Sequence, residues 1–231
     1  VKFDEILFKN IDIDIKKQER IALVGDNGVG KTTLFKTILD QLNAYQGKIK
    51  FGSKVDLAYY DQEHSTLAMD KTIFNEISDN FPKMTNTEIR NSLALFNFKG
   101  DDVFKEISLL SGGEKGRVVL TEILLKQANL LILDEPTNHL DIASKEVLED
   151  ALNQFEGTIF FISHDRYFIN KVATRVIELT STKAISYDGN YDTYLNHKSI
   201  AKPLKKENVD YLDMKQQNAL YRKQQNKIKK I

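Results

Sequence analysis

A glycine-rich segment that ends in lysine and threonine is the strongest chemical signal in this chain. With the threonine that follows, it reads Gly25-Asp26-Asn27-Gly28-Val29-Gly30-Lys31-Thr32-Thr33, and it matches the phosphate-binding pattern GxxxxGK[ST]. Glycines let the backbone bend until its N–H groups face phosphate oxygens, and the start of a helix adds free donors and partial positive charge. Lys31 would neutralise the β- and γ-phosphates of a nucleotide, and the Thr32 hydroxyl would ligate Mg²⁺.

Two neighbouring carboxylates form the second chemical signal. The apolar run at 130–133 reads as a buried strand and ends in Asp134 and Glu135. Asp134 would hold Mg²⁺ through a water molecule. Glu135 would polarise the attacking water, because phosphoryl transfer mainly needs positioning, charge stabilisation and one well-placed base. An acidic strand end needs no chemistry on its own, but the phosphate-binding segment upstream favours a catalytic role.

Strand-like and helix-like segments alternate along the chain, and each candidate site follows a strand. Short apolar or alternating runs predict strands at 11–15, 20–24, 48–51, 55–60, 130–133, 158–162, 176–179 and 183–187. Helical spacing predicts helices at 31–42, 73–77, 88–96, 114–126 and 144–155. This order predicts an α/β layered sheet, with the helical stretch between its two halves forming a lobe.

Composition and charge indicate the cellular location and the domain organisation of the protein. The 33 basic and 33 acidic residues balance, and the absence of cysteine excludes disulfides and fits a reducing cytoplasm. No apolar run could span a bilayer and no leader opens the sequence, so we expect a cytoplasmic location without membrane insertion. Residues 196–231 carry a net charge of +7 and residues 1–195 one of −7, which indicates a folded body with a basic, partly helical extension.

A third motif distinguishes among proteins that share the first two. Leu110-Ser111-Gly112-Gly113-Glu114 stands just before a predicted helix and resembles the signature motif of ATP-binding-cassette (ABC) ATPases. In that family the loop contacts the γ-phosphate bound by a partner cassette, so Ser111, Gly112, Gly113 and Glu114 are expected to reach ATP in trans. The resemblance implies a P-loop NTPase cassette at 1–195, with a mixed sheet core, a small antiparallel β-lobe and an inserted helical subdomain at about 70–126.

Other positions resemble further functional motifs of the same family. Gln62 resembles the glutamine that senses Mg²⁺ and the attacking water, Asp141 the aspartate at the dimer seam, and His164 the histidine that contacts the γ-phosphate. Phe3 stands where the family places an aromatic that stacks on adenine, although Phe8 is an alternative. The resemblance therefore implies ATP as ligand, Glu135 and His164 as catalytic residues, and Mg²⁺ held by Thr32, Gln62 and Asp134.

Two branches of the family remain open. One is the ATPase subunit of a membrane transporter, and the other is half of an ABC-F protein, a soluble twin-cassette protein that acts on ribosomes as a translation factor or antibiotic-resistance factor. Residues 134–141 and 163–168 resemble the ABC-F form, and only 31 positions separate Lys31 from Gln62. A non-hydrolytic scaffold is a third alternative, which the intact Glu135 and His164 disfavour.

The single copy of each motif implies that a second cassette, in the same full-length chain or in a homodimer, completes the site. Residues 142–168 resemble second cassettes, so we expect this chain to be the second cassette of such a protein. The alternative is a first cassette, because the lysine-rich tail at 196–231 could equally begin the linker that follows one. The tail is either a helix that contacts ribosomal RNA or a solvated charged helix. We expect an isolated cassette to bind ATP and to hydrolyse it poorly.

Overall fold

The structure is a computed structural model that describes residues 7–42, 46–60, 67–126, 128–138 and 140–201. The described residues up to Tyr194 form one compact unit, and those from Leu195 onward belong to a second. The glycine-rich segment, the carboxylates Asp134 and Glu135, and the signature loop at 110–114 all lie in the first unit.

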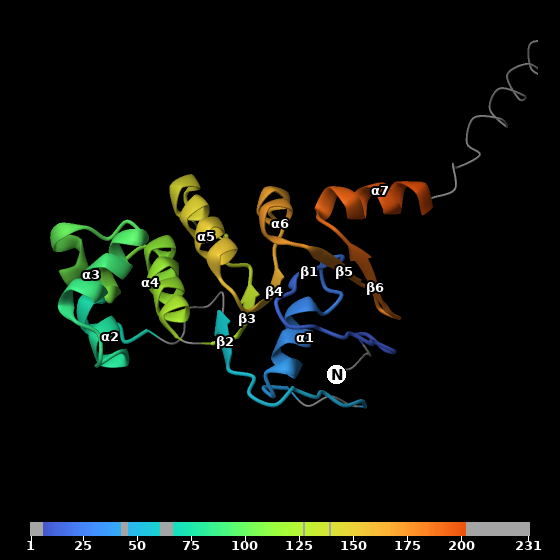
Figure 1. Ribbon diagram of the computed structural model, residues 1–231, viewed down its shortest axis with the longest axis horizontal. Coiled ribbons are helices and arrows are strands. Elements are labelled where there is room, and N and C mark those ends of the chain that lie inside the picture. The colour runs from blue at the N-terminus through green and yellow to red at the C-terminus, as the bar shows by residue number, and fades with distance from the viewer. Residues whose placement is uncertain (1–6, 43–45, 61–66, 127, 139, 202–231) are drawn as a thin grey trace, which may run out of the picture. The chain divides into compact units, whose positions relative to one another are not determined.

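A six-stranded mixed sheet, in the order β2-β3-β4-β1-β5-β6, is the centre of this unit. The first five strands in that order are parallel, and β6 is antiparallel to β5. The strands are β1 (Arg20–Val24), β2 (Leu57–Tyr60), β3 (Leu130–Asp134), β4 (Thr158–Ile162), β5 (Arg175–Leu179) and β6 (Ala184–Asp188). Because parallel strands end at one edge of the sheet, the loops after β1, β3 and β4 lie side by side (Figure 1).

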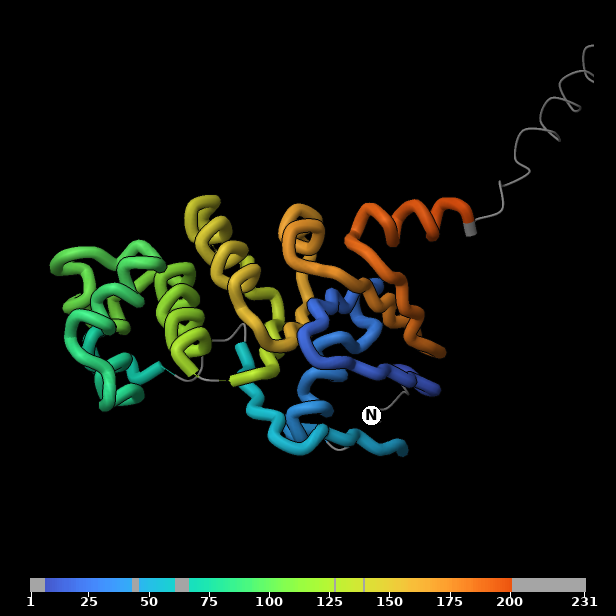
Figure 2. The backbone as a smooth tube through the Cα atoms, viewed as in Figure 1, coloured from blue at the N-terminus to red at the C-terminus, as the bar shows by residue number. Residues whose placement is uncertain are grey.

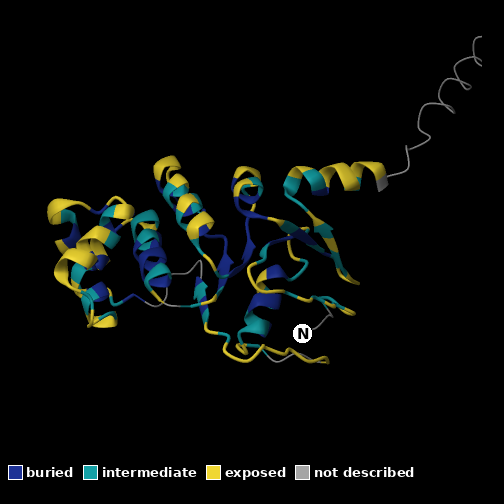
Figure 3. Cartoon of the chain, viewed as in Figure 1, coloured by how far each residue is buried: buried dark blue, intermediate teal, exposed yellow. Residues whose placement is uncertain are grey.

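Helices cover both faces of the sheet because successive strand residues point to opposite sides. In β1, Ile21 and Leu23 pack in one cluster with Phe35 of α1 (Lys31–Ile38), whose ring meets that of Phe160 at 4.9 Å between centroids. Ala22 and Val24 face the other cluster, which includes side chains of α4 (Gly112–Leu125), α5 (Ile142–Gln154) and α6 (Arg166–Val172). Figure 3 shows the central strands as dark blue, buried segments between these layers.

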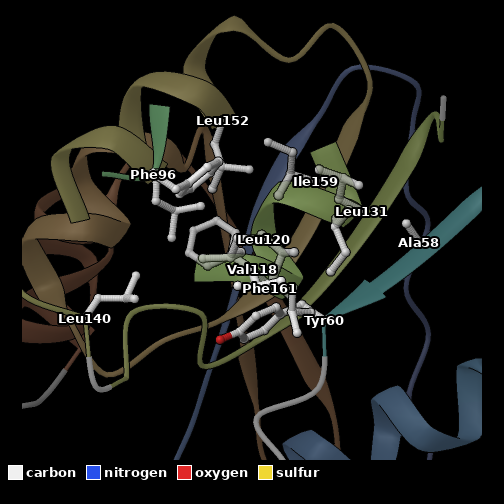
Figure 4. Close-up of a cluster of buried hydrophobic side chains, with 14 of the residues drawn as sticks. Ala58, Tyr60, Phe96, Val118, Leu120, Leu131, Leu140, Leu152, Ile159 and Phe161 are labelled. Carbon is white, nitrogen blue, oxygen red and sulfur yellow. The ribbon is translucent and has the colours of Figure 1, made fainter. Parts of the chain in front are cut away.

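A helical lobe joins the sheet through α4. It contains α2 (Ile73–Asn80), α3 (Asn86–Leu95) and two 3-10 turns, Gly100–Phe104 and Ile107–Leu109. Threonine caps begin both helices, at Thr72 and Thr85. Figure 4 shows how the lobe is anchored: Val118 and Leu120 of α4 lie among side chains of β2, β3 and β4.

The remaining helix, α7 (Tyr191–Ala201), follows β6. No helix within the described ranges is both long and apolar enough to cross a membrane.

Two predicted strands are wrong, and with them the antiparallel lobe is missing from the described residues. Residues 11–15 alternate between half-buried isoleucines and exposed aspartates, as predicted, but they form no ladder of backbone hydrogen bonds. Residues 48–51 are extended and exposed on all sides, with Ile49 46% and Phe51 50% exposed. A short extended segment without a buried face has nothing to hold it in a sheet, and Figure 2 shows this stretch as a cyan tube before β2.

The helix α1 is shorter than predicted, ending at Ile38 rather than at residue 42. Asp40 adopts a left-handed backbone with φ of 59°, and the N–H groups of Gln41 and Leu42 turn back to the carbonyl of Lys36. This turn satisfies the last carbonyls of the helix and ends it.

Candidate nucleotide-binding site

An open cavity of about 390 Å³ lies at the carboxyl edge of the sheet. Most of its lining comes from the ends of β3 and β4, the loops that follow β1, β3 and β4, and the first turn of α1, and one residue precedes β1. The lining residues are Leu7, Asn27, Gly28, Gly30, Lys31, Thr32, Thr33, Asp134, Glu135, Asn138, Ile162 and His164. Nine of these were predicted from sequence as site residues. The cavity therefore gathers the glycine-rich segment, both carboxylates and His164 in one place.

The glycine-rich loop leaves the start of α1 uncapped. Gly30 is the N-cap with φ of 100°, no side chain accepts a hydrogen bond from the first turn, and that turn contains no acid. A side chain at Gly25 would meet the carbonyl oxygen of Leu179 at 2.5 Å, so the loop needs glycine there to pass the sheet. The helix start thus keeps amide donors and its positive dipole end for an anionic ligand.

Lys31 lies folded into this loop rather than extended into solvent. Its Nζ donates to the carbonyl oxygens of Gly25 at 2.9 Å and Asp26 at 3.2 Å, and the residue is 9% exposed. Burial lowers the pKa of the amine, while the charges of Glu135, Asp134 and Asp26 oppose that shift. The ammonium therefore joins two carbonyls of the loop, and the residue lines the cavity.

Glu135 is held in a strained and buried position directly after β3. Its backbone is left-handed with φ of 51°, its N–H donates to the carbonyl of Ile162 at 3.0 Å, and its side chain is 9% exposed. Burial raises the pKa of its carboxyl; the charge of Asp134 adds to this, and His164 and Lys31 counteract it. A raised pKa makes a carboxylate a stronger base, which suits activation of water.

His164 is connected to Glu135 at two points. The His164 N–H donates to Oε2 of Glu135 at 3.2 Å, and its Nε2 lies 3.4 Å from Oε1. Oε1 is buried and takes no hydrogen bond from any described residue. A buried acceptor without a donor is costly, and the glutamate that carries it lines the cavity.

Buried hydroxyls and a helix cap fix the backbone around His164. Oγ of Ser163 lies 3.1 Å from Oγ1 of Thr137, which joins the loop after β4 to the loop after β3. The N–H of Asp165 donates to the same serine at 3.0 Å, and the Asp165 carboxylate caps α6. The exposed imidazole, 62% accessible, therefore projects from a fixed backbone.

The signature loop lies outside this cavity and forms a capping box at the start of α4. The Glu114 carboxylate accepts from the N–H of Ser111 at 2.9 Å and from its hydroxyl at 2.8 Å, while the Glu114 N–H donates back to Ser111 Oγ at 3.3 Å. These bonds lower the pKa of Glu114. Ser111, Gly112, Gly113 and Glu114 are thus kept together, but none lines the cavity of the same chain.

Asp141 also stands outside the cavity. It caps α5, where its Oδ1 accepts from the N–H of Ser144 at 2.7 Å, and its Oδ2 lies 3.2 Å from Nη1 of Arg117 on α4. The hydrogen bonds from Ser144 lower the pKa of its carboxyl, with Arg117 adding to the effect. It therefore joins the signature helix to α5.

The remaining predicted residues divide into two groups. Phe3 and Gln62 lie outside the described residues. Gly25, Asp26 and Val29 belong to the glycine-rich loop without lining the cavity. A side chain at Gly30 would come within 3.0 Å of the Phe8 ring, so this alternative aromatic packs against the loop.

The donor set fits Mg²⁺ bound together with a nucleotide. Thr32 and Asp134 both line the cavity, and no group of three or more histidine, aspartate or glutamate side chains in the described ranges could hold a metal by itself. Mg²⁺ is usually held by one or two protein ligands plus water and substrate phosphates. The site therefore suits an ion that arrives with its substrate.

Sequence reasoning missed several residues that shape these sites. Leu7, Asn138 and Ile162 line the cavity, and Arg117 and Lys145 join the helices beside it. Asn138 and Ile162 stand next to predicted motifs, and that proximity was an available signal. Arg117 and Lys145 carried none, because their partners lie 24 and 20 residues away.

Comparison with known proteins gives concordant matches. The family model described as "ABC transporter" matches residues 8–138. "Putative ATP-binding protein YdiF" of Bacillus subtilis (strain 168) is 50% identical over 202 residues, 87% of this chain and 32% of that protein. "ABC transporter F family member 5" of Arabidopsis thaliana is 40% identical over 194 residues, 83% of this chain and 28% of that protein.

A third relative carries a more specific name. "Energy-dependent translational throttle protein EttA" of Escherichia coli (strain K12) is 38% identical over 200 residues, 84% of this chain and 36% of that protein. The chain thus spans about a third of the length of the curated relatives it matches.

Proposed function

We propose, from the premise that this chain belongs to the ATP-binding-cassette family of ATPases and is one cassette, that it hydrolyses ATP when a second cassette closes over its nucleotide. The observation that carries the proposal is the convergence of Lys31, Asp134, Glu135 and His164 on one cavity. Three parallel strands deliver these side chains to the same sheet edge, where ligands bind in open α/β sheets.

Five side chains of the cavity have distinct parts in this proposal. Lys31 exchanges its bonds to the loop carbonyls for phosphate oxygens, and the uncapped amides of α1 bind the same phosphates. Thr32 and Asp134, with Gln62, would hold Mg²⁺, which would supply positive charge against the phosphates. Glu135 accepts the proton of the attacking water, and His164 contacts the γ-phosphate while its N–H keeps Glu135 in place.

The signature loop and Asp141 act on the nucleotide of the second cassette. Both stand outside the cavity of their own chain, which supports a role in trans. Relatives about three times as long as the matched segment leave room for a second cassette in the same chain. A homodimer of this cassette would provide the same two faces.

The biological setting we propose is that of an ABC-F protein on the ribosome, in the cytoplasm. The match to an F family member and to a relative named as a translational throttle supports this setting. On the ribosome, the protein would act either as a translation factor or as a factor that protects the ribosome from antibiotics. Residues 1–195 are the ATP-binding domain, 70–126 its helical subdomain, and the basic residues 196–231 an extension that contacts ribosomal RNA.

Removal of the proposed base tests the enzymatic part. Glu135→Gln in the full-length protein should lower phosphate release at saturating ATP by about 10³-fold, since general bases contribute about 10²–10⁴-fold. ATP binding should be retained and the closed state prolonged. Glu156→Gln, at an exposed glutamate, is the matched control and should hydrolyse normally. Normal hydrolysis by Glu135→Gln would show that another group is the base.

Ribosome association tests the setting separately. The full-length protein with ATP should co-sediment with ribosomes, and the bound fraction should fall steeply as salt rises, because phosphate contacts release counterions. The measurement is the pelleted fraction across a salt series. Co-purification with a membrane subunit instead would favour the transporter alternative.

A further inference from the structure

A single arginine joins the signature helix to α5. Nη1 of Arg117, three residues after Glu114, donates to Oδ2 of Asp141 at 3.2 Å and to Oγ of Ser144 at 2.9 Å. Ser144 is fully buried, and Asp141 and Ser144 form the first turn of α5. These two bonds therefore join α4 directly to the start of α5.

Arg117 is not an ordinary surface ion-pair residue. Its side chain is 14% exposed, and its guanidinium lies over the Phe98 ring at 5.2 Å. Its Nε is buried and donates no hydrogen bond to any described residue. A guanidinium that is kept in place with one donor unsatisfied is costly to the fold, which points to a role beyond stability.

A lysine carries the connection from α5 to α6. Lys145, the residue after Ser144, donates from Nζ to Oδ2 of Asp165 at 2.7 Å. The other oxygen of Asp165 accepts the N–H groups of Tyr167 and Phe168, so this carboxylate is bonded on both sides. Asp165 directly follows His164, whose N–H is bonded to Glu135.

We infer that Arg117 and Lys145 are positioning residues that connect the signature loop to His164 and so couple the two ATP sites of a closed cassette pair. This inference rests on the proposed function, in which the signature loop serves the partner's ATP and His164 serves its own. When the partner's phosphate draws Ser111 and α4 toward it, Arg117 moves the start of α5, and Lys145 transmits that movement to Asp165 and His164.

We call this connection from Arg117 through Lys145 to His164 the relay. A double-mutant cycle in the full-length protein tests it. Arg117→Met and Lys145→Met keep an unbranched stem and remove the charge, and each should lower kcat about tenfold with the KM for ATP nearly unchanged. If both residues act in one relay, the double variant should also lose only about tenfold. Losses that multiply to about 100-fold would show two independent roles and overturn the relay.

Conservative and matched controls separate positioning from folding. Lys145→Arg keeps the charge and should restore most of the lost kcat. Lys105→Met is the matched control, because Lys105 pairs with Asp102 at the same 2.7 Å but lies in the helical lobe; it should leave kcat unchanged. An equal loss in Lys105→Met would mean that any lost ion pair produces the effect.

A second measurement does not depend on hydrolysis. In amide NMR spectra of this cassette without nucleotide, Arg117→Met should shift the signals of His164 and Asp165, as should Lys145→Met, whereas Lys105→Met should not. Unchanged signals in Arg117→Met would overturn the relay even in a protein that hydrolyses ATP. If the shifts are present but the wild type does not hydrolyse ATP, the proposed function alone is refuted.

Discussion

Two helix starts in this molecule face anions in different ways. The start of α1 has a left-handed glycine cap, no side-chain acceptor and no acid in its first turn. The start of α4 has Ser111 and Glu114 bonded to each other in a capping box. One set of donors is open to a ligand, whereas the other is already partly satisfied by a carboxylate of its own chain.

The difference fits the two tasks that we propose for these loops. The loop before α1 must bind phosphate in a single cassette, so its donors and Lys31 are ready without any partner. The loop before α4 meets phosphate only across a dimer. Glu114 keeps this loop folded until then, and the Ser111 hydroxyl must give up its 2.8 Å bond to that carboxylate before it can donate to a phosphate.

Lys31→Met, at the start of α1, should have the largest effect of the substitutions that compare the two helix starts. We expect ATP affinity of this cassette to fall about 100-fold or more, because a buried cation and charge-assisted bonds to phosphate are lost. Isothermal titration with ATP and Mg²⁺ measures it. Lys36→Met, in the last turn of the same helix, should bind normally, and equal weakening in both variants would contradict a specific role for Lys31.

Ser111→Ala should separate stability from turnover. Loss of the cap should cost about 1 kcal/mol in the free energy of unfolding, and turnover in paired cassettes should fall about tenfold while ATP affinity of the single cassette stays unchanged. Thr85→Ala removes the equivalent cap from α3. It should cost similar stability with no loss of turnover; if turnover fell as much, the effect of Ser111 would be structural.

The two glutamates should give opposite dependences of stability on pH. Hydrogen bonds from Ser111 lower the pKa of Glu114 below its ordinary 4.5, so its contribution is present above 4.5 and is lost as pH falls through the lowered value. Burial raises the pKa of Glu135, so its contribution is present below 4.5 and is lost as pH rises through the raised value.

Thermal unfolding across this pH range measures both effects. Relative to Glu114→Gln, the wild type should lose its stability advantage on acidification below pH 4.5. Relative to Glu135→Gln, it should lose stability as pH rises above 4.5. Parallel curves for both comparisons would contradict the assigned environments.

Glu114→Gln at neutral pH should have the smallest effect. Glutamine also completes a capping box, so the free energy of unfolding should change by less than about 0.5 kcal/mol. Without the charge, Ser111 should be released more easily, and turnover of paired cassettes should hold or rise slightly. Steady-state phosphate release measures this, and a loss as large as that of Ser111→Ala would show that the carboxylate itself acts on the nucleotide.

Sequence motifs predicted the family and the centre of the fold, and both are confirmed. The resemblance of Ser111–Glu114 to the ABC signature agrees with the family match over residues 8–138. Strands β1, β3 and β4 occur within a residue of their predicted bounds, because short, continuous apolar runs bounded by turn residues are typical of strands buried on both faces of a sheet. The roles of individual residues at the site stay predictions.

Other features depended on contacts that no local pattern contains. The isoleucines at 11–15 revealed which side is buried, but not whether a neighbouring strand would pair with them. Helix α1 ended early through the backbone of Asp40, a residue that adopts a left-handed conformation more readily than most. Arg117 and Lys145 belong to no motif in the sequence, and they gain partners only when α4, α5 and α6 pack together.

The left-handed backbone of Glu135 affects which substitutions would stabilise this protein during evolution or engineering. A left-handed glutamate costs on the order of 1 kcal/mol that glycine would not. Selection for thermostability alone would therefore favour Glu135→Gly, and the more stable protein would lack the base that we propose. A stabilising screen that ignores turnover should enrich this substitution, so the residue marks where durability and activity compete.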